Sequence, residues 1–219
     1  MEATWDGSMR RESLNDWVVI ARNALADAAK NYDWPRVFEI LSEHQEFVNT
    51  WRLGGTSLYA PLHQAAYGGA PVDVVQQLLR LGAWRTLQNA RGERPVDVAA
   101  RKGHAHLLAI LAPEYKRDVP LGVLLKIQAH FHEVICGRAD RLVREHDLRL
   151  PELEPLLELE NSEIWFPVPG MMGGFKFRLE SPGVDAKLVS ESWCRAAEGS
   201  GERHEITSAG SRLVEKGFV

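Results

Sequence analysis

The first half of the chain consists of apolar residues at helical spacing, interrupted by short polar segments. Such spacing after Trp17 predicts a helix that runs to Lys30, and a second helix starts at Asp33-Trp34-Pro35, where proline suits the first turn. Two further pairs of helices are predicted, the first over 61–69 and 72–79, the second over 95–103 and 104–111. The pattern therefore indicates a succession of helix pairs.

Two of these pairs begin with similar sequences. Pro61-Leu62-His63-Gln64-Ala65-Ala66 corresponds to Pro95-Val96-Asp97-Val98-Ala99-Ala100 at an offset of 34 residues. Ala28-Ala29 in the first pair aligns with Ala65-Ala66 at an offset of 37. Small alanines allow neighbouring helices to approach closely, while leucines of the second helices fill the space between layers. We therefore interpret the three pairs as repeats of one structural unit.

The period and the Pro-Leu-His-x-Ala-Ala sequence resemble those of the ankyrin repeat family. The resemblance covers residues 23–113, as units at about 23–53, 57–87 and 91–113. It implies a solenoid in which stacked helix pairs bury their apolar faces against one another. It also implies that His63 and His104 are structural imidazoles that hydrogen-bond the adjoining turn.

The second half of the chain changes character. An apolar face over 122–144 predicts one long helix. Four segments with strand periodicity follow, and the residues after Thr207 are expected to form a short final helix; the predicted strands span 163–168, 173–180, 186–196 and 202–206. The predicted fold class is mainly α, an ankyrin-repeat stack followed by a long helix and a small antiparallel sheet.

We expect two domains. Residues 1–118 would form the repeat domain with an N-terminal capping helix, and residues 119–219 would form the long helix, the sheet and the final helix. The segment Trp165–Gly170 is similar to a tail attached to ankyrin repeats in some uncharacterised bacterial proteins. That similarity implies no activity.

Composition and charge disfavour several classes of function. The chain has 219 residues and a net charge of −4, which disfavours nucleic-acid binding through clustered Lys and Arg. No apolar stretch is long enough for a membrane span, and no signal peptide is expected at the N-terminus. Only two cysteines are present, which favours a reducing compartment. We therefore expect a cytoplasmic protein that contacts neither nucleic acid nor membranes.

Few residues in the sequence indicate a catalytic, phosphate-binding or metal-binding site. His132 and Cys136 are four apart on the predicted long helix, the start of a nucleophile–base pair, although no third orienting group is identifiable. The glycine-rich segment 169–174 lacks the Gly-Lys-Ser/Thr of a phosphate loop. Histidines two apart on a helix do not converge on a metal. We expect no cofactor, no metal and no enzymatic activity; an enzyme with a site near His132 and Cys136 is kept as an alternative.

The ankyrin resemblance favours a protein–protein interaction module. We expect the turns at the tips, the inner helices and two methionines of a later turn to contact a partner protein: Leu58, Tyr59, Tyr67, Trp84, Asn89, Arg91, Glu93, Arg101, Met171 and Met172. A second alternative is an immunity or antitoxin protein that masks a basic toxin. It rests on the seven acidic residues between Glu145 and Glu163, against the single Arg149.

Overall fold

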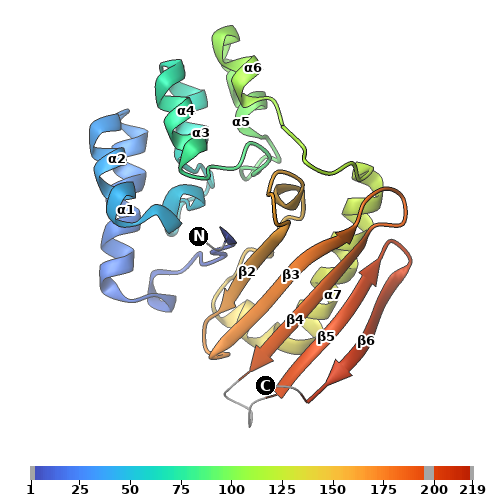
Figure 1. The fold of residues 1–219 in the computed structure, drawn as a ribbon. Coiled ribbons are helices and arrows are strands. Elements are labelled where there is room, and N and C mark those ends of the chain that lie inside the picture. Colours follow the sequence, from blue (N-terminus) through green and yellow to red (C-terminus); the bar gives the residue numbers. More distant parts are fainter. Residues whose placement is uncertain (1–2, 195–199, 218–219) are drawn as a thin grey trace. The chain divides into compact units, whose positions relative to one another are not determined.

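The computed structural model describes residues 3–194 and 200–217, which fall into two compact units (Figure 1). The helical unit is Leu14–Glu114, and the sheet unit combines Met1–Ser13 with Tyr115–Val219. These units differ from the expected domains at both ends of the helical unit, since residues 115–118 also belong to the sheet unit. Residues at the N-terminus belong to the sheet unit, because Ala3 and Thr4 pair in parallel with Ile164 and Trp165.

The helical unit contains three successive helix pairs (Figure 1). α1 packs against α2 and α3, α3 packs against α4 and α5, and α5 packs against α6. The elements are α1 (Asp16–Lys30), α2 (Trp34–Glu43), η2 (Gln45–Asn49), α3 (Pro61–Gly68), α4 (Val72–Arg80), α5 (Pro95–Lys102), η3 (Ala105–Leu107) and α6 (Leu108–Leu111). The predicted helix over 104–111 is thus split into a short 3-10 turn and one α-turn.

Small residues of the first helices and larger apolar residues of the second helices form one core. Ala29, Ala65, Ala66 and Ala99 are fully buried, and so are Leu41, Leu78 and Leu107 of the second helices, in agreement with the sequence pattern. Ala100 differs, because it is exposed.

The first helices of the three pairs end in the same way. Just after the C-terminal end of each of these helices, one residue adopts a left-handed conformation, with φ of 60° at Tyr32, 65° at Gly69 and 77° at Gly103. The next residue then donates its N–H to an alanine carbonyl of the same helix: Asp33 to Ala28, Ala70 to Ala65 and His104 to Ala99. These positions are separated by the offsets of 37 and 34 found in the sequence.

The sheet unit is built around a six-stranded sheet in the order β1-β2-β3-β4-β5-β6. β1 is parallel to β2, and the other neighbours are antiparallel. The strands are β1 (Ala3–Thr4), β2 (Glu163–Val168), β3 (Gly173–Ser181), β4 (Lys187–Cys194), β5 (Ser200–Thr207) and β6 (Gly210–Lys216), and the short 3-10 turns are η1 (Arg11–Ser13) and η4 (Glu154–Leu157).

The long helix α7 (Leu121–Glu145) packs against β2, β4, β5 and β6. The ring of its fully buried Phe131 packs against strand β3, with its centroid 4.8 Å from that of Phe177 and 6.4 Å from that of Phe175. The predicted long helix and antiparallel sheet are therefore confirmed for these elements.

The predicted fold class, mainly α, is wrong. Strands β1 to β6 make the chain an α+β protein. The expected final helix is instead β6, because Thr207 and Gly210 close a tight hairpin that pairs the last residues with β5. β1 was not predicted either, since its partner strand is about 160 residues away in sequence. Within the described residues, no helix has the length and apolar character needed to cross a membrane.

Candidate protein-binding groove

A concave cavity of about 730 Å³ lies on the helical unit. It is bordered by the end of α1, the two tip loops and the exposed sides of α3 and α5. We call it the groove. Its lining comprises Ala26, Lys30, Tyr32, Arg52, Gly55, Thr56, Ser57, Leu58, Tyr59, Gln64, Tyr67, Ala90, Arg91 and Arg101.

Equivalent positions of the three helix pairs supply side chains to the groove. Lys30, Tyr67 and Arg101 are separated by the repeat offsets of 37 and 34, so each lies at the same place near the end of its helix. All three are exposed. The repeat geometry therefore lines up two cations and a tyrosine along one surface.

The helix ends also bring Tyr32 into the groove. The ring of Tyr32 lies against the backbone of Gly68, where a Cβ atom would overlap it. Gly69, with its left-handed φ, similarly leaves room for the ring of His104. Glycine tolerates both the conformation and the close approach, so residues 68–69 let aromatic rings of the neighbouring pairs pack closely.

An aromatic and cationic cluster forms one wall of the groove. The ring of Tyr59 is 6.0 Å from that of Tyr67, and its hydroxyl accepts a hydrogen bond of 3.2 Å from Arg101 Nη2. Lys102 Nζ lies 4.2 Å from the centroid of the Tyr67 ring, a cation–π contact. This wall offers both flat apolar area and positive charge.

Arg101 is oriented by a carboxylate of the adjacent tip. Its Nε donates to Glu93 Oε1 at 2.6 Å, and its Nη2 donates to Glu93 Oε2 at 3.1 Å. This two-pronged pair lowers the pKa of Glu93, with a further contribution from Asn89, and it raises the pKa of Arg101. Both groups therefore stay charged over the physiological range.

The tip loop that carries Arg91 is organised by Asn89. The Asn89 side chain accepts from the N–H groups of Arg91 and Glu93 at 2.7 and 3.1 Å, and it donates to Glu93 Oε2 at 2.9 Å. Its own N–H donates to the Glu93 carbonyl, to which His63 Nε2 is also hydrogen-bonded at 3.2 Å. Asn89 is 4 % exposed, so it shapes the loop instead of facing solvent.

The predicted contact residues are thus divided by the structure. Leu58, Tyr59, Tyr67, Arg91 and Arg101 line the groove together, and Glu93 supports Arg101 beside it. Trp84, like Asn89, is buried, and its backbone N–H donates to Asn49 Oδ1 at 2.9 Å.

The two predicted methionine contacts lie in the sheet unit, in the turn between β2 and β3. Met171 is 2 % exposed and Met172 is 69 % exposed. Of this pair, only Met172 is accessible to a partner in the described structure.

Sequence reasoning missed several groove residues, including Lys30, Tyr32, Arg52 and Gln64. Lys30 was detectable, because the alignment of Ala28-Ala29 with Ala65-Ala66 also places Lys30 opposite Tyr67. Tyr32 was not, since nothing in the sequence indicates that a tyrosine at a left-handed helix end packs against a glycine of the next pair.

The expected hydrogen bond to a turn is confirmed for His63, whereas His104 is bonded to a carbonyl within helix α3. His63 is bonded to the Glu93 carbonyl in the next tip, and His104 Nε2 is bonded to the Tyr67 carbonyl at 3.1 Å. Both bonds connect one helix pair to the next. These imidazoles are therefore part of the scaffold.

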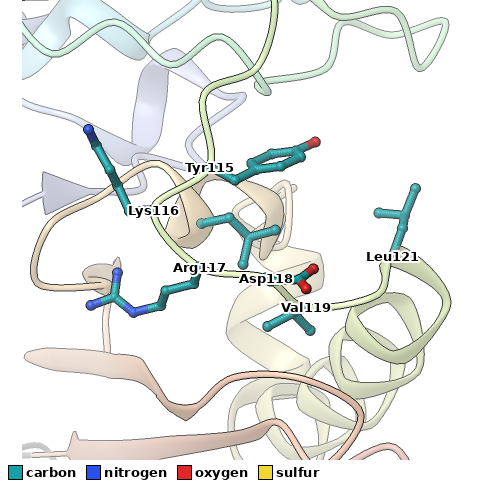
Figure 2. A pocket seen from close by; sticks show the side chains of 7 residues that line it. Tyr115, Lys116, Arg117, Asp118, Val119 and Leu121 are labelled. Atoms are coloured by element: carbon teal, nitrogen blue, oxygen red, sulfur yellow. The ribbon is translucent and has the colours of Figure 1, made fainter.

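A smaller cavity, of about 410 Å³, lies in the sheet unit between the connector 115–121 and Leu157 (Figure 2). Polar side chains that line it are hydrogen-bonded to neighbouring segments of the same unit. Tyr115 donates to Glu154 Oε1 at 2.5 Å, and Arg117 donates to the carbonyls of Leu159 and Glu160 at 2.6 and 2.7 Å. These contacts attach the connector to η4 and to the residues that follow it, so these polar side chains have structural partners within the sheet unit.

His132 is hydrogen-bonded to the backbone of the segment that follows the long helix. Its Nε2 is hydrogen-bonded to the Pro151 carbonyl at 2.8 Å, and burial lowers its pKa. Among the residues that the structure describes, no hydrogen bond joins His132 to Cys136. The same part of the chain contains no group of three or more His, Cys, Asp or Glu side chains placed to hold a metal ion.

Much of the acidic segment 145–163 is engaged within the sheet unit. Glu152 pairs with Arg149, and Glu154 accepts from Tyr115. Glu160 lies 3.5 Å from Lys116 Nζ, and Glu163 lies 2.9 Å from Lys176 Nζ. These four carboxylates do not form a free acidic surface.

No protein-family model matches the chain, and no curated protein is similar to it in sequence.

Proposed function

We propose that the chain is an ankyrin-like interaction module that binds a segment of a partner protein in the groove, without making or breaking covalent bonds. The observation that carries the proposal is the shared location of five of the expected contact residues. Leu58 and Tyr59, Tyr67, Arg91 and Arg101 come from two tips and two inner helices, yet they line one cavity. Tyrosine and arginine are the residue types most enriched at binding hot spots.

The ankyrin-like character of the unit is supported by features that recur with the repeat offsets. The left-handed helix ends and the hydrogen bonds to Ala28, Ala65 and Ala99 recur in all three pairs. The first two pairs are also joined by side-chain hydrogen bonds, since Gln45 and Asn49 donate to the carbonyls of Leu81 and Gly82 at 3.1 and 2.8 Å. A rigid stack of this kind presents a preformed surface, which limits the entropy lost on binding.

The same proposal includes a location in the cytoplasm. Cys136 and Cys194 are both free thiols, as expected of a protein in a reducing compartment such as the cytoplasm.

The two alternatives have weaker support. Masking of a basic toxin was suggested by the acidic segment, of which four carboxylates are already engaged. An enzyme in the sheet unit would use His132 and Cys136 as a base and a nucleophile, but within the described residues no hydrogen bond joins these two side chains. We therefore favour the groove as the functional surface.

Affinity capture from the source cells, followed by mass spectrometry, tests the proposal. A double variant, Tyr67→Ala with Arg91→Ala, removes two exposed groove side chains. The matched control is Val72→Ala with Arg80→Ala, on exposed positions of α4 that do not line the groove. We expect the protein captured by the wild type to be lost with the groove variant and kept with the control. Equal capture by both variants would contradict a groove-based interaction.

A further inference from the structure

We propose, on the basis of the function proposed above, that the segment bound in the groove is rich in carboxylates, that is, an Asp- and Glu-rich stretch of the partner protein. This deepens the proposed function by assigning the chemistry of the partner.

Positive charge is concentrated in the groove. Residues 14–114, all of which the structure describes, contain ten basic and ten acidic side chains, so the unit as a whole is neutral. Lys30, Arg52, Arg91 and Arg101 nevertheless line the groove, and none of its lining residues is acidic. The acidic residues are thus placed elsewhere on the unit, and the field in the groove favours an anionic ligand.

Two carboxylates approach the rim of the groove and reduce this charge without cancelling it. Asp27 pairs with Arg52, and Glu93 pairs with Arg101. Within residues 14–114, Lys30 and Arg91 form no ion pair, and both are exposed. Lys102, over the ring of Tyr67, adds a further positive charge beside the groove.

The pair between Arg101 and Glu93 shows how a partner carboxylate would be held. Both oxygens of Glu93 are engaged by two nitrogens of one guanidinium, at 2.6 and 3.1 Å. A planar guanidinium matches a carboxylate in this way better than an ammonium does. Arg91, which forms no such pair within residues 14–114, offers the same group to a carboxylate of a bound segment.

The cavity and its tyrosines favour a peptide over a nucleic acid. A volume of about 730 Å³ accommodates only a few residues, whereas binding to nucleic acid relies on an extended basic stripe that a neutral unit does not provide. Tyr32 and Tyr67, 43 % and 38 % exposed, supply flat apolar area for the backbone and side-chain stems of an extended segment. A tyrosine side chain loses little conformational entropy on binding, because it has few rotatable bonds.

Fluorescence anisotropy with the full chain tests the inference. The probes are three short labelled peptides of equal length, in which glycine alternates with glutamate, with lysine or with serine, and a single-stranded oligothymidylate. The variant Lys30→Glu with Arg91→Glu reverses two groove charges. The control Arg36→Glu with Arg80→Glu makes the same change in net charge at exposed positions outside the groove. Thermal unfolding of both variants checks that each is folded.

We expect the glutamate peptide to bind the wild type at least about tenfold more tightly than the lysine or serine peptides, and more weakly as salt is raised. The groove variant should lose this preference, and the control should keep it. Equal affinity for the three peptides, tighter binding of the oligothymidylate, or equal loss in both variants would overturn the inference. If the captured partner still depends on Tyr67 and Arg91 in that case, the proposed function stands and only the assigned chemistry fails.

Discussion

The ring of Tyr32, at the end of α1, lies directly against the backbone of Gly68, at the end of α3. The next residue, Gly69, has a left-handed φ of 65° and lies against the ring of His104, with a Cβ position only 2.6 Å from the imidazole. Two adjacent glycines thus allow contacts among the three helix pairs of the helical unit. Gly68 supplies space for a ring, whereas Gly69 supplies both space and a left-handed backbone conformation.

Alanine substitutions at the two glycines should therefore differ in cost. Gly69→Ala would place a side chain in a left-handed conformation and against His104, so we expect a loss of about 1–2 kcal/mol or more in the free energy of unfolding. At Gly68 the backbone is helical, where alanine is favoured over glycine by about 1 kcal/mol, and the half-exposed Tyr32 ring can rotate away. We expect Gly68→Ala to change stability by less than about 1 kcal/mol. Urea denaturation measures both, and equal losses would contradict the explanation.

His63 should be a structural residue of the helical unit. It is fully buried, and its ring contacts Tyr59 and is bonded to the tip at Glu93. His63→Ala should cost about 2–3 kcal/mol, because it removes buried volume and a hydrogen bond to a part-buried carbonyl. His106→Ala, at an exposed position, is the control and should cost less than about 1 kcal/mol. A similar cost for both would show that burial of His63 is not the source of its effect.

Stability should decline on mild acidification because of two histidines of the sheet unit. Burial lowers the pKa of His132 and of His204. The folded state then binds fewer protons than the unfolded state, so their contribution is complete above the unfolded pKa, about 6.5, and is lost as the pH falls below it. We expect the double variant His132→Gln with His204→Gln to flatten the dependence of unfolding free energy on pH between 7 and 5. An unchanged slope in chemical denaturation would refute this assignment.

The sheet unit should depend on its core far more than on the charged side chains of its strands. Phe131→Ala would empty the space against Phe175 and Phe177 and should cost about 3–5 kcal/mol. Lys187 bridges Glu180 and Glu205 at 3.0 Å each, but all three side chains remain partly exposed to solvent. Lys187→Ala should leave the unfolding midpoint almost unchanged, because exposed ion pairs contribute little. Calorimetry of the two variants gives the comparison, and a large shift for Lys187→Ala would contradict it.

Local patterns in the sequence predicted the elements that depend on local interactions. The helix boundaries near Lys30 and Gly68, the long helix over 122–144 and four strands follow from periodicity, prolines and glycines. The segment after Thr207 was interpreted as a helix because its pairing with β5 depends on a turn at Gly210 that sequence spacing does not reveal. β1 likewise depends on a partner in the distant β2.

The candidate site shows the same division. Tyr59, Tyr67, Arg91 and Arg101 lie in the groove because the repeat pattern fixes where tips and inner helices are exposed. Trp84 is of a residue type common at binding hot spots, but it is buried. Its burial depends on packing between distant segments, which residue type alone does not indicate. The groove residue Tyr32 depends on a close approach to Gly68 that residue types alone do not indicate.

The central claim is that the groove of the helical unit holds a partner protein. Site-specific photo-cross-linking tests it most directly, with a photoreactive amino acid placed at Tyr67, inside the groove, or at Val72, exposed on α4 outside it. We predict that the partner captured from the source cells is cross-linked from position 67 and not from position 72. Cross-linking from position 72 alone, or from neither position while the partner remains bound, would contradict the account.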